Sequence, residues 1–170
     1  MNKRTFVVLV CALFCLCAFL FYIFYNKARK TAIKHTNETQ MVHAKVAARG
    51  IEEYFTTWIG VLNALSKTDD ITKNNSEGKN FIKLLSEAHP DEILSINRLN
   101  EKGIIISSSD NRRIGSDLLG HKHIQELLHH HQTIISDVFS IDEGDNAISI
   151  QVPIFKGASF NGSICALIDF

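Results

Sequence analysis

The chain has 170 residues, of which 45% are hydrophobic, and its 18 basic and 18 acidic residues leave no formal net charge. Once an apolar N-terminal run is set aside, this length holds one ordinary domain. The balanced charge, with no basic stripe, gives no electrostatic case for nucleic-acid binding, and the four cysteines, with Cys11, Cys15 and Cys17 inside the apolar run, cannot build a disulfide framework or a zinc site.

The run at 5–25 carries no charge and is bounded by Lys3 and Arg4 on one side and by Lys27 on the other. A helix over this run is about 30 Å long, which is the thickness of the hydrocarbon core of a bilayer. The sequence therefore predicts a transmembrane helix at 5–25 behind a short N-terminal segment at 1–4. A cleaved signal peptide is the alternative, but the run is longer than a typical signal-peptide core and lacks a small-residue cleavage site.

The flanking charges bear on the orientation of this segment. More basic residues follow the run than precede it, and the positive-inside rule would then place the following domain in the cytoplasm. Large domains can nevertheless translocate regardless of flanking charge. The charges alone leave the orientation open.

A long stalk and docking helix is predicted at 26–66, because no proline interrupts this stretch. Apolar residues recur at steps of three and four along its second half, including Ile51, Tyr54 and Trp58. The first half is much more polar. We expect the helix to leave the membrane as a stalk and to dock on a core only through its second half.

A polar connection is predicted at 67–79, followed by a short helix at 77–88. Ser76 is the expected N-cap of this helix, and its core face is expected to carry Phe81, Leu84, Leu85 and Ala88. The helix is predicted to end before Pro90, because a proline disfavours the helical conformation of the residue that precedes it.

Two strands, at 92–99 and 104–108, are predicted to form a hairpin whose turn ends in Gly103, where a positive φ is needed. A polar loop at 107–120 and a short helix at 121–131 follow.

The plainest two-residue alternation lies at 133–170 and predicts three strands joined by two turns. Ile148 and Ile150 alternate with Ser149 and Gln151, so the sheet has one apolar face. Such a face must be covered by other elements. The sequence therefore predicts an α+β fold, in which an N-terminal transmembrane helix and a long stalk helix precede a PAS-like five-stranded antiparallel sheet with flanking helices, with the sensor-type domain at 67–170.

The order of these elements, together with four pieces of sequence, resembles the Cache family of extracytoplasmic sensor domains, PAS-like modules also called PDC domains. The four pieces are INRLNEKGII at 96–105, RIGSDL at 113–118, ISDVF at 135–139, and VPIF at 152–155 with FNGSI at 160–164. The resemblance covers about residues 32–170. The Arg-x-Trp-Tyr run with which some relatives bind amino acids is absent.

The resemblance implies a membrane-anchored, extracytoplasmic ligand-sensing input domain of a bacterial signal-transduction protein. Such domains belong to two-component sensor histidine kinases, diguanylate cyclases and chemoreceptors, and the output module is expected outside this chain. The implied location is single-pass in the inner (plasma) membrane, with the N-terminal segment 1–4 in the cytoplasm and the domain outside, against the charge count. The implied partners are a small-molecule ligand (a carboxylate or an amino acid), the membrane, and a second copy that forms a homodimer through the long helix.

In such a domain the pocket lies on one sheet face, beneath the loop and helix between the second and third strands. The candidate ligand-binding residues there are Arg112, Arg113, Asp117, His121, His123 and Asp137. A guanidinium can hold a carboxylate bidentately, whereas the alternative is a surface ion pair with Asp110 or Asp117. Asp137 could accept a ligand ammonium, or it could instead anchor the loop.

No cofactor, metal or enzymatic activity is predicted. His121 and His123 are two residues apart and do not share a helix face, and the three histidines at 129–131 spread around a helix end. No nucleophile elbow, Walker loop or zinc-protease motif occurs. The alternative functions are a membrane-tethered interaction domain without a small ligand and an anchored hydrolase, and the lack of a nucleophile–base pair disfavours the hydrolase.

Overall fold

The computed structural model describes residues 3–141 and 146–169, with the side chains of 3–12, 15 and 18 left outside the description. The chain divides into two compact units, Met1–Ile51 and Glu52–Phe170. The long helix α1 (Lys3–Ser66) makes up the first unit and supplies its last residues, 52–66, to the second.

Within the first unit, residues 27–51 of α1 are exposed on all sides of the helix. No helix among the described residues combines the length and the apolar character that crossing a membrane requires. The predicted span at 5–25 lies partly outside those residues, because the side chains of 5–12, 15 and 18 are not described.

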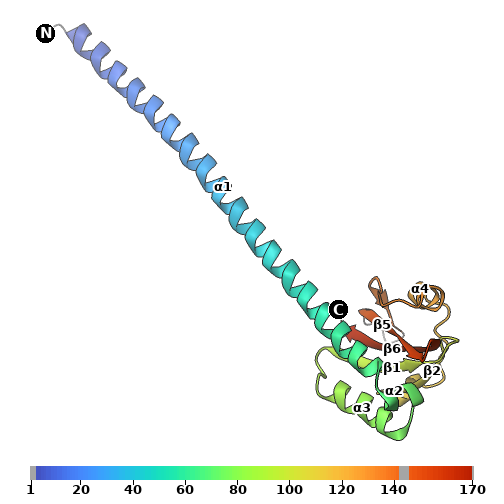
Figure 1. The fold of residues 1–170 in the computed structure, drawn as a ribbon. Helices are drawn as coiled ribbons and strands as arrows, with labels where there is room; N and C mark the ends of the chain where they lie inside the picture. Colours follow the sequence, from blue (N-terminus) through green and yellow to red (C-terminus); the bar gives the residue numbers. More distant parts are fainter. Residues whose placement is uncertain (1–2, 142–145, 170) are drawn as a thin grey trace. The chain divides into compact units, whose positions relative to one another are not determined.

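The second unit is built on one antiparallel sheet. Its strands are β1 (Ile93–Leu99), β2 (Ile105–Ser108), β3 (Ile134–Ile135), β4 (Phe139–Ser140), β5 (Asn146–Lys156) and β6 (Ser159–Asp169). They run in the order β2-β1-β6-β5-β3, and β4 also pairs with β5 (Figure 1).

The sheet therefore has six strands where the sequence predicted five. The predicted third strand is divided into β3 and β4, because Ile135 lies opposite Ile150 and Phe139 lies opposite Ala147. Four steps on one side against three on the other leave an extra residue, which interrupts the ladder. Between β3 and β4, the hydroxyl of Ser136 accepts a hydrogen bond from the main-chain N–H of Ser149 on β5. The first of the two turns predicted within 133–170 includes residues 142–145, which lie outside the described residues.

The alternation in β5 and β6 decides which face of the sheet is apolar, as predicted. Ile150 and Val152 belong to the main buried core and Ile148 is also buried, whereas Ser149 and Gln151 face the other side of the sheet. On β6 the residues Ile164, Ala166 and Ile168 join the same core.

Three helices cover this apolar face, namely the end of α1, α2 (Asp69–Lys73) and α3 (Ser76–Glu87). Trp58 and Leu62 of α1 are buried, as the predicted stripe required. Ile51 is 58% exposed, so the docked stripe begins at Tyr54 and not at Ile51. The predicted polar connection contains α2 because Ile71 turns into the core.

The predicted core face of α3 was right only in part. Leu85 packs against the core as predicted, but Phe81 and Leu84 are exposed, and Gly78 and Ile82 are buried instead. Gly78 sets this face, because a Cβ there would lie 2.4 Å from the main-chain oxygen of Asp70. Only glycine lets α3 approach α2 this closely. The N-cap is Asn75 and not the predicted Ser76, because it is the side chain of Asn75 that accepts the main-chain N–H of Gly78, at 2.9 Å.

A buried arginine ties α2 to the sheet. Arg98 on β1 is 1% exposed and donates hydrogen bonds to the main-chain oxygens of Ile71, Leu99, Asn161 and Ser163. Burial lowers the pKa of Arg98 to about 10, so the side chain is still a cation at pH 7. Its charge is stabilised by carbonyl dipoles.

The opposite face of the sheet carries a second, smaller core formed by Leu99, Ile105, Ile124 and Cys165. The short helix η1 (Asn111–Arg113) and helix α4 (Lys122–His130) lie over this face. In Figure 1, α4 lies on the other side of the sheet from α2 and α3. The β1–β2 hairpin turns at Gly103, whose φ of 78° confirms the predicted positive value. η1 and α4 cover this face only in part, and the candidate site lies on the uncovered part between them.

Candidate functional site

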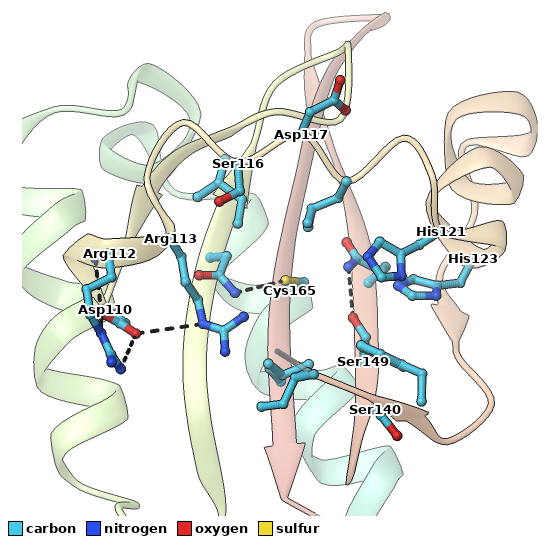
Figure 2. Close-up of a pocket in the computed structure, with 17 residues that line it drawn as sticks. Asp110, Arg112, Arg113, Ser116, Asp117, His121, His123, Ser140, Ser149 and Cys165 are labelled. Carbon is cyan, nitrogen blue, oxygen red and sulfur yellow. Dashed lines mark hydrogen bonds and ion pairs between the residues drawn. The ribbon is translucent and has the colours of Figure 1, made fainter. Parts of the chain in front are cut away.

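A cavity of about 320 Å³ lies on this second face of the sheet. Its floor comes from β1, β5 and β6, and its sides come from the segment 110–118, the beginning of α4 and the segment 139–141 (Figure 2). This volume is at the small end of the range that is typical for ligand pockets.

The floor is a layer of buried, uncharged polar side chains. The strand alternation that sends the isoleucines of β5 into the main core sends Ser149 and Gln151 to the cavity. Asn97 on β1 and Cys165 on β6 are direct cross-strand neighbours, and Gln151 lies opposite Cys165 from the other side. The cavity therefore rests on a continuous polar row across three strands.

Hydrogen bonds within the floor fix these side chains. The Nδ2 of Asn97 donates to Ser95 Oγ at 3.0 Å and to Cys165 Sγ at 3.6 Å. The Nε2 of Gln151 donates to Ser149 Oγ at 2.8 Å. Burial raises the pKa of Cys165, so its sulfur is a neutral thiol at pH 7 and a poor nucleophile.

A cluster of charges from η1 forms one side of the cavity. The carboxylate of Asp110 accepts from Arg112 Nε at 3.1 Å, from Arg112 Nη2 at 2.9 Å and from the main-chain N–H of Arg112 at 3.0 Å. Arg113 Nε lies 3.8 Å from the same carboxylate. The hydrogen bonds from Arg112 are the main reason why the pKa of Asp110 is lowered, so it remains ionised.

Three rings form the side opposite this charge cluster. The ring centroids of His121 and His123 lie 5.5 and 5.2 Å from that of Phe139. Burial is the main cause that lowers the pKa of His123 to about 4, with the neighbouring His121 adding to it and Glu126 opposing it. The imidazole of His123 is therefore neutral at pH 7, and this side offers flat apolar surface together with ring nitrogens.

The structure brings five of the six predicted site residues to this cavity, namely Arg112, Arg113, Asp117, His121 and His123. Asp117 lies at the rim, where its Oδ1 accepts the main-chain N–H of Leu119 at 2.9 Å. Figure 2 shows its carboxylate pointing away from the floor. Its position agrees with a turn-stabilising role better than with contact deep in the cavity.

Asp137 is not at this cavity, and its predicted placement there was wrong. It is exposed in the interruption between β3 and β4 and lines an adjoining hollow, which shares His121, His123 and Phe139 with this cavity. The extra residue in this stretch turns the chain outward, which periodicity in a single strand does not reveal.

Sequence reasoning missed the floor residues Asn97, Ser149, Gln151 and Cys165 as members of the site. A signal for two of them was present, since Ser149 and Gln151 were predicted on the face away from the apolar core. Buried polar side chains need hydrogen-bond partners, so polar residues on one face of a buried strand indicate that this face contacts other polar groups, such as a ligand. Asn97 and Cys165 could be added only once the pairing of β1 with β6 was known.

The remaining histidines lie elsewhere. His131 follows α4 in the left-handed conformation, and its ring stacks on Phe160 with a centroid distance of 4.1 Å. Across the residues that the structure describes, no three His, Cys, Asp or Glu side chains come together as a metal site would require.

Comparison with known families gives one match. The family model described as "HK/GC/Chemotaxis protein-like, sensor domain" matches residues 63–169, which include the whole sheet up to Asp169. No curated protein sequence matches the chain.

Several solved structures share the fold. The sensor domain of the V. cholerae histidine kinase DctB has a TM-score of 0.59 and 15% identity, over 70% of this chain and 50% of that one. The ligand-binding domain of the Campylobacter jejuni chemoreceptor Tlp3, in complex with 4-methylisoleucine, has a TM-score of 0.59 and 15% identity, over 74% and 55%. The E. coli DcuS sensor domain has a TM-score of 0.56 and 14% identity, over 69% and 90%. The chain thus spans about half the length of the first two, and at these identities the likeness shows the fold alone.

Proposed function

The chain belongs to the HK/GC/chemotaxis protein-like sensor domain family, and from this premise we propose that it is the ligand-sensing input domain of a membrane-anchored bacterial signalling protein. Its resemblance to Cache, or PDC, sensor domains is confirmed by the family match and by the structural neighbours. The α+β architecture, with a long helix and an antiparallel sheet, fits the PAS-like sensor fold.

The observation that carries this proposal is the cavity on the sheet face opposite the docked helices. Its floor is polar and already satisfied by internal hydrogen bonds, and arginines stand at one side, with rings at the other. Polar groups converging on a small cavity are the usual features of a ligand site. An interaction domain without a small ligand would instead fill this space with its own side chains, and the cavity counts against that alternative.

Structural neighbours support a small ligand. Tlp3 has been solved with isoleucine and with L-valine in its sensory or ligand-binding domain. By analogy, which is an argument from fold, we propose a carboxylate or an amino acid as the ligand of this chain. The pocket residues proposed to bind it are Arg112, Arg113, His121 and His123, with Asp117 at the rim.

The location is also part of the proposal. The apolar run at 5–25 would anchor the chain in the inner membrane, and the domain would lie on the extracytoplasmic side. A structural neighbour from Desulfohalobium retbaense, described as an extracellular ligand binding receptor, supports this side. Ligand binding would shift the population between two arrangements of the domain, and α1 would pass that shift to an output module outside this chain.

A homodimer through α1 is proposed from the exposure of residues 27–51 on every side. Helices in proteins gain most of their stability by packing one face against a partner. A second copy would provide that partner along a segment that nothing else described in the chain covers.

The test is a thermal-shift screen of the full chain in detergent against amino acids, carboxylates, amines and nucleosides. A true ligand at about a hundred times its Kd should raise Tm by roughly 5 °C or more. If no compound raises Tm, the ligand-sensing function is wrong.

A further inference from the structure

Arg112 and Arg113 are adjacent in η1, but they face different surroundings. The side chain of Arg112 is 75% exposed, whereas that of Arg113 is 26% exposed. Both approach Asp110, whose side chain is 22% exposed. Two guanidinium groups therefore lie near one carboxylate. The carboxylate binds only one of them bidentately, so the two arginines differ in the number of donors left for a ligand.

Arg112 is engaged by Asp110. Its Nε and Nη2 hold the two carboxylate oxygens at 3.1 and 2.9 Å, which is the bidentate arrangement of a strong arginine–carboxylate pair. The same carboxylate accepts the main-chain N–H of Arg112 and so caps η1. This pair fixes the short helix that carries Arg113.

Arg113 contacts Asp110 only through Nε, at 3.8 Å. Among the described residues, no acceptor lies within hydrogen-bonding distance of its two terminal nitrogens. In Figure 2 its side chain descends from the loop toward the sheet, with the guanidinium above the floor. A half-buried guanidinium with unused donors in a cavity is stabilised by an anionic partner.

Apart from the two arginines of η1, the described lining offers an anion no permanently charged cation. The floor consists of neutral amides, hydroxyls and a thiol. On the far side, His123 packs against Phe139, and burial keeps the imidazole uncharged at pH 7. A second carboxylate on the ligand would lose its hydration there without gaining a charged partner.

We propose that Arg113, held in place by the Arg112–Asp110 pair, anchors the single carboxylate of a small monocarboxylate ligand, whose remaining part lies toward His123 and Phe139. This rests on the proposed function and narrows it in two respects. One arginine of the pair binds the ligand, and a ligand with a second carboxylate is disfavoured.

Matched compounds test the ligand class on the wild-type full chain in detergent. Butanoate, 2-hydroxybutanoate and leucine are each compared with their amides, and the first two also with succinate and malate, by thermal shift and calorimetry. At least one monocarboxylate should bind, with its amide and its dicarboxylate counterpart weaker by about tenfold or more. Stabilisation by amides, amines or dicarboxylates equal to that by monocarboxylates would overturn the inference while leaving a ligand-sensing function intact. If none of these compounds binds, the inference also falls, and the broader screen then decides the proposed function.

Paired variants test the anchor. Arg113→Gln should weaken monocarboxylate binding by about ten- to a hundredfold, because the anchor itself is lost. Arg112→Gln removes only the residue that positions Arg113 and should weaken binding less, by about three- to fivefold. Arg49→Gln, at an exposed position of α1 that does not line the cavity, is the matched control and should leave binding unchanged. Arg113→Lys keeps the positive charge but cannot bind a carboxylate bidentately, so its affinity for the monocarboxylate should lie between those of Arg113→Gln and wild type. Circular dichroism and Tm without ligand show whether each variant folds, and the wild-type comparison of acid with amide remains decisive if Arg113→Gln does not. Equal losses in Arg112→Gln and Arg113→Gln would contradict the division of roles.

Discussion

Arg113 and His123 stand on either side of the cavity, and partial burial acts on them in different ways. Arg113 keeps its positive charge although it is partly buried above the floor of the cavity. The carboxylate of Asp110 lies 3.8 Å from its Nε and stabilises that charge. At His123 burial removes a charge, because the imidazole loses solvation and gains only a weak opposing effect from Glu126. The cavity thus has a charged arginine at one side and an uncharged His123 at the other.

The neutral His123 predicts a pH dependence of stability. Its pKa in the folded chain is about 4 against an ordinary 6.5, so between these values the unfolded chain binds a proton that the folded chain does not. Stability therefore rises with pH in this window and is lost as the pH falls through it. Between pH 7.5 and 5.5, wild type should lose about 0.5–1 kcal/mol more than His123→Gln, a value reduced by solvent screening.

Urea unfolding at three pH values in this range measures the difference. His129→Gln is the matched control, because His129 is exposed at the end of α4 and its removal should leave the wild-type slope unchanged. Identical slopes in wild type and His123→Gln would show that His123 is not kept neutral by the fold.

At the scale of elements, close approaches decide how the helices sit on the apolar face. α3 packs against α2 where Gly78 meets the backbone at Asp70, and this contact turns Ile82 inward and leaves Phe81 in solvent. On the other face, η1 and α4 leave part of the sheet uncovered, and the cavity occupies that part. The two faces of one sheet thus serve stability and binding separately.

Gly78→Ala should destabilise the chain by about 2 kcal/mol, because the added methyl group would collide with the main chain of Asp70 and force α3 away from α2. Gly60→Ala is the matched control, since no atom lies within 4 Å of a Cβ at Gly60 and the position is inside α1. It should stabilise by about 0.5–1 kcal/mol through helix propensity alone. Chemical denaturation measures both, and equal effects would contradict the proposed tight contact.

At the scale of the whole molecule, the proposed function requires that the sheet domain lie on the extracytoplasmic side of the membrane that the proposed anchor spans. The charge flanking 5–25 favours a cytoplasmic domain, whereas the proposed location is extracytoplasmic. A domain that binds external ligands is useful only in the second arrangement. The orientation is therefore the property on which the whole proposal depends.

Fusions at the C-terminus test the orientation in a bacterial host. Alkaline phosphatase, which is active only outside the cytoplasm, should be active when fused after residue 170, and a green fluorescent protein fusion should be dark. Deleting 1–26 should abolish the phosphatase activity, because the proposed anchor is lost. Bright fluorescence from the full-length fusion would place the domain in the cytoplasm and refute the proposed location.

The amino-acid sequence by itself determined the type of fold and much of the site. Alternation in β5 and β6 fixed which residues enter the core, since side chains on a strand alternate strictly between its faces. The turn at Gly103 and the stripe from Tyr54 to Leu65 followed from equally local rules. Arg112, Arg113, His121 and His123 could be named because they lie on one loop and the helix that follows it.

Tertiary structure alone decided the rest. The division between β3 and β4, and with it the outward position of Asp137, depends on the register against β5. The inward face of α3 depends on how closely Gly78 can approach another helix. Asn97 and Cys165 became part of the site only through the pairing of strands far apart in the sequence. Local periodicity reports which way a side chain points within its own element, whereas the partner it meets is set by packing between elements.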